Sequence, residues 1–337
     1  MEYINTQWLL DKRPEGMPED SCWKMNKESI TSLEANEILI QVKYLSIDPY
    51  MRGRMNEGAS YAAAAKIGEA MTGETVGEVV ESNSNLFKVG DKVCAHKGWQ
   101  TFIKVKDTDP TLFKVPSSNL NLSTYLGTVG MPGRTAYFGL NRVGKPKSGE
   151  TVVVSAASGA VGTVVGQLAK SYGCYVVGIA GGPEKCSYVK DVLKFDDCID
   201  YKAGNLDQTL KDACHNGIDI YFENVGGEVT RAVAPLLNPG SRVPICGFIS
   251  QYNAKDMFEA ETPFHVLGAL KPKPEHRFFV VTEWLNEWEQ ATKEITNLIE
   301  ADKIFYKETI TKGIENAPQA LRDVLTGKNF GKQLIEI

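Results

Sequence analysis

The sequence predicts an α/β protein in which an antiparallel, barrel-like β domain precedes a doubly wound parallel sheet. Three observations support this fold class. Short apolar segments separated by turn-forming residues fill the first 125 or so residues, and apolar runs then alternate with helical patterns. Within the second region, residues 152–170 read as a buried strand, a glycine-containing turn and a helix in direct succession.

The first part of the chain has the pattern of antiparallel strands. Apolar segments recur at 37–44, 77–81 and 91–95, and glycines and asparagines separate them. The run of small residues at 61–65 is typical of a loop or a short helical turn. We therefore expect a barrel-like β domain here.

Near residue 125 the pattern changes to alternating helix and strand. Residues 130–140 predict a helix, and 283–300 carry an apolar stripe at helical spacing. The alternation in 331–337 predicts a closing strand that can return to the first domain. The candidate strands of the parallel sheet are 151–157, 175–180, 197–201, 218–225, 241–247 and 277–282, which are apolar throughout, as strands covered on both faces are.

Residues 251–276 show no clear periodicity and contain Pro263, Pro272 and Pro274. We expect a long loop there. A loop of this length is commonly functional, and a surface insertion is the alternative.

The composition restricts the class of protein. The net charge of −5 argues against nucleic acid or an anionic membrane as the main partner. No apolar run reaches the roughly 20 residues of a membrane-spanning helix, and residues 1–6 lack the features of a secretory signal. The seven cysteines form no C-x-x-C pair, which predicts reduced thiols and a cytoplasmic location.

The turn after the first parallel strand has the form of a dinucleotide-binding site. Glycines in such a turn let the backbone approach a pyrophosphate, and the helix that follows offers N–H groups and the positive end of its dipole. The second strand, at 175–180, completes the βαβ context that this motif requires. The residues expected at the pyrophosphate are Ala156, Gly159, Ala160, Val161 and Gly162.

The end of the second strand favours NADP(H) over NAD(H). An NAD site usually carries an acidic residue there to bind the ribose hydroxyls, whereas this strand ends in Gly181 and Gly182. Lys185 follows within reach of a 2′-phosphate. The alternative is a solvated lysine, but the helix dipole disfavours a lysine in the first turn, which favours an anionic partner.

Several motifs together resemble a known family. The chain resembles the zinc-free branch of the medium-chain dehydrogenase/reductase superfamily, and within it the prostaglandin reductase, alkenal double-bond reductase and curcumin reductase group. The motifs are SIDPYMR (46–52), GTVGMPGRTAY (127–137), the 156–170 segment, DYK (200–202), FENVGG (222–227) and ICGFISQYN (245–253).

The resemblance implies a fold, a cofactor and an assembly. A GroES-like catalytic domain would span residues 1–126 and be joined by 302–337, and a Rossmann domain over 127–301 would bind NADP(H). The protein would form homodimers. By position, the resemblance implies that Lys185 and Tyr201 flank the 2′-phosphate, and it adds Met131, Pro132, Gly181, Asn224, Cys246, Phe248, Ile249 and Asn329 to the cofactor-binding residues.

Compared with zinc-dependent relatives, the sequence lacks the metal-binding residues at the corresponding positions. The segment that carries Gly-His-Glu in those proteins reads TGETVG (72–77), and the position of their early cysteine reads SID (46–48). We therefore expect no bound metal. The four histidines, His96, His215, His265 and His276, have no ligand spacing and are interpreted as surface or loop residues.

Without a metal ion to polarise a carbonyl, conjugate reduction of a C=C bond is the easier reaction to support. Hydride reaches the β-carbon, and a hydrogen-bond donor must stabilise the enolate oxygen. A phenol can donate and then deliver a proton, and the resemblance places the DPYMR motif (48–52) at the cleft, so Tyr50 is the candidate; the cofactor ribose hydroxyl can share this role. A packed barrel tyrosine is the alternative. Arg52 either orients a polar substrate end or forms a surface salt bridge.

One position departs from the family. Its prostaglandin reductases carry a tyrosine on the last Rossmann strand, where this sequence has Thr282, whose hydroxyl is too short to span the same gap. The substrate pocket is then larger, or Tyr252 fills it; Tyr252 can equally be a loop aromatic that covers the cleft. Substrate preference stays open.

The leading hypothesis is an NADPH-dependent reductase of the C=C bond of α,β-unsaturated aldehydes and ketones, with a small-molecule substrate and no nucleic-acid or membrane partner. Two alternatives remain. One is an NADPH quinone oxidoreductase, and the other is a non-catalytic NADPH-binding protein with a regulatory or structural role.

Overall fold

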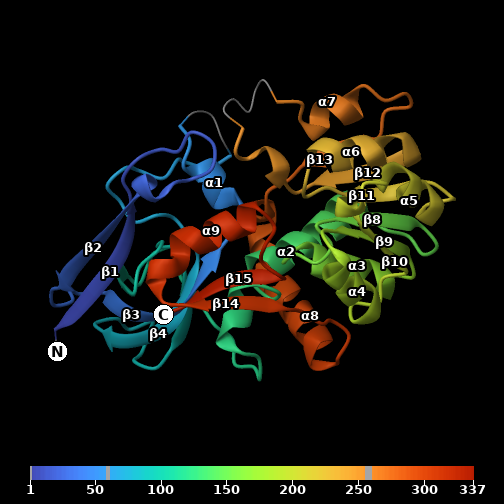
Figure 1. Ribbon diagram of the computed structural model, residues 1–337. Coiled ribbons are helices and arrows are strands. Elements are labelled where there is room, and N and C mark those ends of the chain that lie inside the picture. Colours follow the sequence, from blue (N-terminus) through green and yellow to red (C-terminus); the bar gives the residue numbers. More distant parts are fainter. Residues whose placement is uncertain (1, 58–60, 255–259) are drawn as a thin grey trace. The chain divides into compact units, whose positions relative to one another are not determined.

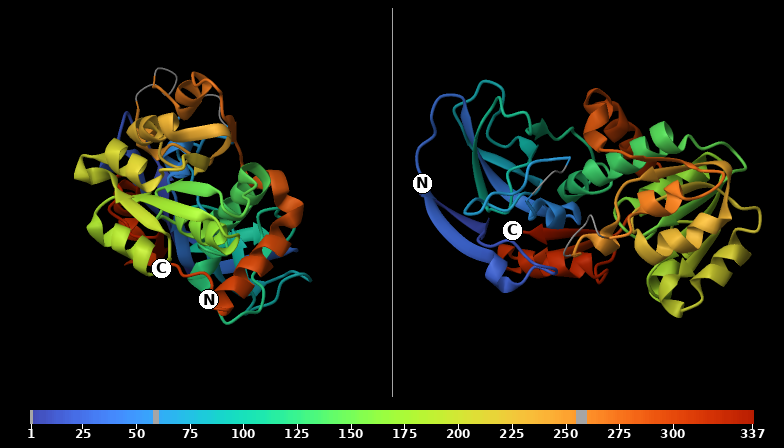
Figure 2. Two further views of the ribbon diagram at one scale, coloured as in Figure 1. Left: turned by 90° about the vertical axis from the view of Figure 1, so that its right-hand side faces the viewer. Right: turned by 90° about the horizontal axis from the view of Figure 1, so that it is seen from above.

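The structure is a computed structural model that describes residues 2–57, 61–254 and 260–337. It divides into two compact units, which are described separately. Unit 1 comprises Met1–Gly127 and Glu308–Ile337, and unit 2 comprises Thr128–Lys307. In Figures 1 and 2, unit 1 carries the blue, teal and red ends of the colour scale, and unit 2 the green to orange middle.

Unit 1 is built mainly on a sheet that is antiparallel apart from one parallel pair, Glu308–Lys312 with Lys332–Glu336. Its strand order is β14 (Glu308–Lys312), β15 (Lys332–Glu336), β3 (Glu37–Ile47), β4 (Thr75–Ser82), β5 (Lys92–Ala95) and β7 (Phe113–Lys114), and β6 (Phe102–Lys106) also pairs with β3. Strands β1 (Tyr3–Leu10) and β2 (Trp23–Ile30) form a separate hairpin-like pair. Two short helices, α1 (Tyr50–Arg54) and α9 (Ala317–Leu325), complete the unit.

The C-terminal strand lies inside the sheet of unit 1. β15 pairs antiparallel with β3, with Ile335 opposite Leu45, and Figure 1 shows red β15 beside blue β3. Alternate residues of β3 (Ile38, Ile40 and Val42) join a buried core, as the two-residue period of a strand requires. The last residues of the chain thus lie next to the strand that leads into α1.

Unit 2 contains a six-stranded sheet whose strands are all parallel. Its order is β10 (Asp197–Asp200), β9 (Tyr175–Ala180), β8 (Thr151–Ser155), β11 (Ile218–Phe222), β12 (Leu237–Ile245) and β13 (Glu275–Phe278). The chain order reverses between β8 and β11, which defines a doubly wound sheet. This confirms the predicted fold class.

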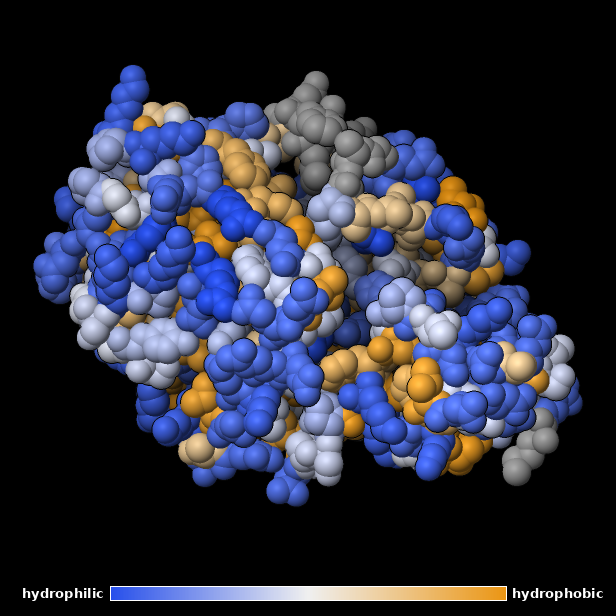
Figure 3. Space-filling model, turned by 180° about the vertical axis from the view of Figure 1, so that it is seen from behind, coloured by the Kyte–Doolittle hydropathy of each residue, from blue (hydrophilic) through white to orange (hydrophobic). Residues whose placement is uncertain are grey.

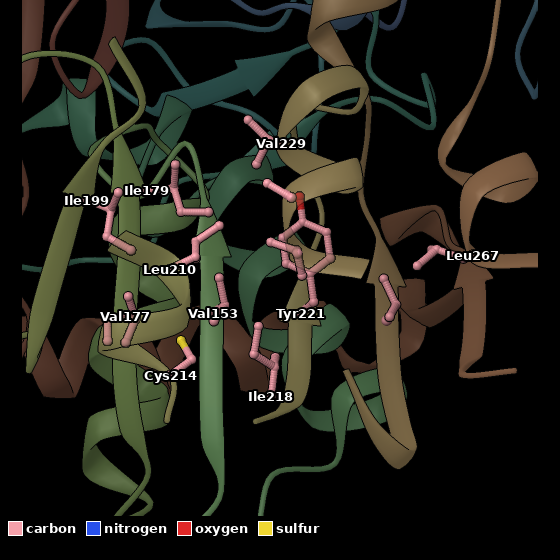
Figure 4. Packing of buried hydrophobic residues seen from close by; sticks show 14 of the residues in the cluster. Val153, Val177, Ile179, Ile199, Leu210, Cys214, Ile218, Tyr221, Val229 and Leu267 are labelled. Atoms are coloured by element: carbon pink, nitrogen blue, oxygen red, sulfur yellow. The ribbon is translucent and has the colours of Figure 1, made fainter. Parts of the chain in front are cut away.

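Helices cover both faces of this sheet. α3 (Gly162–Ser171), α4 (Pro183–Asp191), α2 (Met131–Phe138) and α8 (Trp288–Glu300) form one group, and α5 (Leu206–Ala213), α6 (Gly227–Val233) and α7 (Pro263–Gly268) another. Figure 4 shows the core under the second group, where Val153 and Ile179 from the strands lie near Leu210 of α5. Burial on both faces explains why the central strands β8, β9 and β11 are largely apolar.

The structure corrects the end of the predicted sheet. The strand expected at 277–282 is instead β13, Glu275–Phe278, and a 3₁₀ segment, Val281–Glu287, follows it. Phe279 and Val281 are buried, but Val281 packs with Phe138 and does not extend the strand. The helix expected at 283–300 is therefore this 3₁₀ segment followed by α8, with a break in the helical backbone at Trp284.

Other predicted boundaries shift by a few residues. Strands end at Ser155 and Phe222 rather than at 157 and 225, because the chain turns there into the loops of the sheet edge. The stretch 251–276 is not one long loop, since it contains α7, which begins with a capping box between Thr262 and His265. Residues 255–259 of that stretch lie outside the described residues.

Hydrophilic residues cover most of the molecular face shown in Figure 3, with hydrophobic residues scattered among them. The large hydrophobic side chains exposed on unit 2 include Phe264, Leu285 and Phe305. Among the described helices, none has the length and apolar character needed to cross a membrane.

Candidate functional site

The turn that follows β8 brings together all five residues predicted to hold a pyrophosphate. Ala156 has a φ of +50°, in the left-handed region, and its carbonyl accepts from the N–H of Gly159 at 2.9 Å. A Cβ on Gly162 would lie only 2.3 Å from that carbonyl oxygen, so α3 can begin against the turn only with glycine there. Ala156 and residues 159–161 remain partly exposed beside the helix N-terminus, where an anion is favoured.

Two lysines and a tyrosine surround the end of β9. A Cβ on Gly181 would lie 2.9 Å from Tyr201 Cε1 and 3.0 Å from Lys202 Cε, so a larger residue would fill this space. Burial lowers the pKa of Lys185, and the charge of the neighbouring Lys202 lowers it further. An anion placed here would relieve the repulsion between the two ammonium groups. These residues fit the 2′-phosphate of NADP(H).

The carboxylate of Asp200, the last residue of β10, accepts hydrogen bonds from the backbone of this tip. Asp200 Oδ1 accepts from the N–H of Gly182 at 2.8 Å and from the N–H of Lys202 at 3.0 Å. It thereby holds Lys202 beside the tip of β9. Lys202 belongs to the DYK motif, but no sequence pattern singles it out, because it meets Gly181 only after β10 pairs with β9.

Asn224, Cys246 and Ile249, which the resemblance assigns to the cofactor, lie where β11 and β12 end, next to the point at which the strand order reverses. Asn224 Nδ2 donates to the Ser155 carbonyl at 2.8 Å, and the Asn224 carbonyl accepts from the Ile249 N–H at 3.2 Å. Burial, with a contribution from Glu223, raises the pKa of Cys246 to about 12. Cys246 is therefore a neutral thiol at physiological pH. Ligands of doubly wound sheets bind at this edge.

The two aromatic residues of this loop pack on each other. The rings of Phe248 and Tyr252 are 5.7 Å apart and inclined at 68°. The Tyr252 hydroxyl lies 2.6 Å from the position that a Cβ on Gly247 would take, so glycine there makes room for Tyr252. Both rings belong to the loop that follows β12.

Thr282 does not lie on the last strand, and this part of the sequence interpretation is wrong. It is exposed and belongs to the 3₁₀ segment that follows β13.

Met131 and Pro132 form the first turn of α2. This turn packs closely against the preceding chain, since a Cβ on Gly133 would lie only 1.7 Å from the Thr128 carbonyl oxygen.

Tyr50 is one of several residues of unit 1, Trp23 and Trp99 among them, that have a buried polar atom without a hydrogen-bond partner in the described part of the chain. It opens α1, and its hydroxyl oxygen is buried with no hydrogen-bond partner among the described residues. Burial raises the pKa of Tyr50 well above 10, and the charges of Asp48 and Glu74 raise it further. The hydroxyl is therefore protonated. A buried donor without an acceptor can bind an acceptor atom that a ligand brings.

His96 packs against Tyr50. Their ring centroids are 6.3 Å apart at an interplanar angle of 26°, and His96 Nε2 lies 2.9 Å from Thr72 Oγ1. Burial lowers the pKa of His96, so the ring is neutral at physiological pH. His96 is a loop residue, as expected, but it is partly buried against the candidate catalytic tyrosine.

A buried ion pair supports the strand-to-helix turn that leads to Tyr50. Lys332 Nζ lies 2.8 Å from Asp48 Oδ1 and 2.9 Å from the Ile47 carbonyl, and the two charged side chains are 3% and 8% exposed. Ser46 Oγ donates to the other oxygen of Asp48. No sequence pattern had singled out Lys332.

The interpretation of Arg52 as a surface salt bridge is wrong. The side chain is 1% exposed, because α1 turns it inward. Its Nε donates to the Gly16 carbonyl at 2.9 Å, and Nη1 donates to Asn56 Oδ1 at 2.7 Å.

Asn329 also belongs to unit 1, where its Nδ2 donates to the Gly331 carbonyl at 2.9 Å.

The residues that the structure describes include no group of three or more His, Cys, Asp or Glu side chains placed to hold a metal ion.

Comparisons with known proteins cover nearly the whole chain. Residues 6–115 match the family described as the N-terminal domain of oxidoreductase, and residues 160–297 match the zinc-binding dehydrogenase family. The chain is 43% identical over 336 residues to an NADPH-dependent curcumin reductase of Escherichia coli (strain K12), covering 99% of this chain and 97% of that protein. It is 38% identical over 341 residues to a 2-alkenal reductase (NADP(+)-dependent) of Nicotiana tabacum, covering 100% and 98%.

A solved structure is also similar over the full length. The crystal structure of CurA from Vibrio vulnificus in complex with NADPH has a TM-score of 0.92 and 44% sequence identity, and the match covers 98% of each chain.

Proposed function

Since the chain belongs to the medium-chain dehydrogenases/reductases, in the group of curcumin, alkenal and prostaglandin reductases, we propose that it is an NADPH-dependent reductase. Its substrates are the conjugated C=C bonds of α,β-unsaturated aldehydes and ketones. We assign Tyr50 as the catalytic acid because its hydroxyl is buried, protonated and without a partner among the described residues.

Unit 2 supplies the residues for the cofactor. Lys185, Lys202 and Tyr201 bind the 2′-phosphate, and the turn at 156–162 with the N-terminus of α3 binds the pyrophosphate. Met131, Pro132, Gly181, Asn224, Cys246, Phe248 and Ile249 complete the unit 2 set, and Asn329 of unit 1 joins it. When bound, NADPH supplies the hydride that the reaction needs.

Unit 1 supplies the acid. As hydride adds to the β-carbon, the π electrons of the C=C bond move toward the carbonyl and form an enolate. The Tyr50 O–H donates a hydrogen bond to the enolate oxygen and so stabilises the developing charge. The α-carbon then takes up a proton through this hydroxyl, and solvent restores the phenol. The high pKa of Tyr50 keeps the group a donor throughout the neutral range.

Replacing Tyr50 by phenylalanine should lower kcat for enals at least about tenfold, more than about 1.4 kcal/mol of transition-state stabilisation. The NADPH affinity should stay unchanged, because Tyr50 is assigned to the substrate. Steady-state kinetics with a short enal measure this. Tyr44→Phe, on β3, is the matched control and should behave as the wild type. An unaltered kcat would remove Tyr50 from the mechanism.

The assignment of the reaction is tested by NADPH oxidation across a panel of enals, enones and quinones, with identification of the products. A saturated aldehyde or ketone identifies a C=C reductase. Turnover restricted to quinones would favour the oxidoreductase alternative. Tight NADPH binding without turnover of any of these compounds would favour a non-catalytic role.

We further propose that the protein is a cytoplasmic homodimer. The cysteines are free and most of them are buried, which is typical of a reducing compartment. As the described strands define the unit 2 sheet, β10 and β13 are its two edge strands, and an edge can pair with a second copy. Sedimentation analysis of the purified protein tests the assembly.

A further inference from the structure

Glu223 is a carboxylate enclosed next to the point where the strand order of unit 2 reverses. It follows β11, and its backbone N–H donates to the Pro244 carbonyl at 3.0 Å while its own carbonyl accepts from the Cys246 N–H at 2.9 Å. The residue is 0% exposed. Its side-chain partners within the described part of the chain are all neutral donors. A charge buried in this way requires a set of hydrogen bonds to stabilise it.

Three hydrogen-bond donors lie within 2.9 Å of the same oxygen of this carboxylate. Oε1 accepts from the Tyr221 hydroxyl at 2.8 Å and from the backbone N–H groups of Val225 and Gly226 at 2.7 and 2.9 Å. In Figure 4 the hydroxyl end of Tyr221 points toward α6. The side chain of Glu223 thus fixes the turn that follows its own strand.

The same carboxylate joins two further elements. Thr230 of α6 donates to Oε2, and Ser155 Oγ at the end of β8 lies 3.2 Å from Oε1. Ser155 in turn accepts from the Asn224 backbone N–H at its Oγ and from Asn224 Nδ2 at its carbonyl, both at 2.8 Å. Asn224 is therefore held by the serine that also contacts the neighbouring carboxylate.

This arrangement needs an acceptor at position 223. A carboxylate accepts hydrogen bonds and donates none, which matches the donors around it. An apolar side chain of similar size would leave the buried N–H groups of Val225 and Gly226 without an acceptor, and the turn would rearrange. A glutamine keeps one acceptor oxygen and can donate its NH₂ to Thr230, whose hydroxyl can also accept.

We propose that Glu223 is a positioning residue for the binding of NADPH. It sets Asn224 and the turn at 225–226 in their binding conformation before the cofactor arrives, which lowers the ordering cost of binding. This inference deepens the proposed function, because it rests on the assignment of Asn224 to the cofactor. Glu223 itself acts only through the residues that it holds.

The test compares NADPH dissociation constants, measured by cofactor fluorescence, for Glu223→Leu and Glu223→Gln. We expect Glu223→Leu to bind NADPH at least about thirtyfold more weakly, the effect of losing two buried acceptor contacts. Glu223→Gln should stay within about threefold of the wild type, since it retains the acceptor.

A matched control separates positioning from general stability. Asp219, on the same strand, accepts from the Thr151 N–H at 2.9 Å and from Asn238 Nδ2 at 2.9 Å. Asp219→Leu should lower the melting temperature and leave NADPH binding unchanged. If folded Glu223→Leu binds NADPH as tightly as Asp219→Leu does, the proposal is overturned.

A second measurement needs no variant. In the cofactor-free wild type, the amides of Val225 and Gly226 should exchange with deuterium as slowly as in the NADPH complex, because Glu223 already holds them. Fast exchange that slows only with NADPH would overturn the proposal. Both measurements are independent of turnover, so a failure of the wild type to reduce enals would count against the proposed function alone.

Discussion

Replacing Lys332 by methionine should destabilise unit 1 by about 3–5 kcal/mol, because the substitution leaves the buried Asp48 carboxylate without its ion-pair partner. Methionine keeps most of the apolar stem, so the loss reflects the charge and its hydrogen bond to Ile47. The expected fall in the melting temperature of this unit is roughly 10 °C. Differential scanning calorimetry of the purified variant measures it.

Two further variants make this experiment decisive. Lys66→Met removes the exposed ion pair with Glu69, whose side chains are 76% and 62% exposed, and should change stability by less than about 1 kcal/mol. The double variant Asp48→Leu/Lys332→Met removes both buried charges and should recover much of the loss. If Lys332→Met melts like Lys66→Met, the buried pair contributes nothing to the stability of unit 1.

This ion pair shows why the sequence could not reveal the whole site. Asp48 and Lys332 are 284 residues apart, and only the pairing of β15 with β3 brings them together. No local periodicity carries such information. Tyr50, by contrast, lies in a motif that the sequence displays, although its buried and unpartnered hydroxyl is visible only in the fold.

The predictable parts of the fold are those with local patterns. The turn at 156–162 was recognisable because strand, glycines and helix follow one another within twenty or so residues. The last strand was misplaced because β13 reads Glu-His-Arg-Phe, which has no apolar run, whereas the apolar run beside it is buried in loop and 3₁₀ structure. Tertiary packing there overrides the local pattern.

Replacing both Lys185 and Lys202 by alanine should weaken NADPH binding about a hundredfold and leave NADH binding nearly unchanged. Each lysine is expected to contribute about tenfold, as a charge-assisted hydrogen bond to a phosphate does. NADH lacks the 2′-phosphate, so it loses nothing when the two ammonium groups are removed. Dissociation constants for both cofactors, measured by fluorescence titration, give the ratio directly.

A lysine on the same helix provides the control for this prediction. Lys190 of α4 pairs with Asp197 at 3.0 Å, and Lys190→Ala should leave the preference for NADPH intact. An equal loss of NADPH and NADH affinity in the Lys185→Ala/Lys202→Ala variant would mean that the lysines act on the fold of the β9 tip and not on the phosphate. The turn at Asp200 holds Lys202 beside Gly181, and this position alone assigns Lys202 to the phosphate. The single variants Lys185→Ala and Lys202→Ala therefore decide which lysine causes the preference for NADPH over NADH.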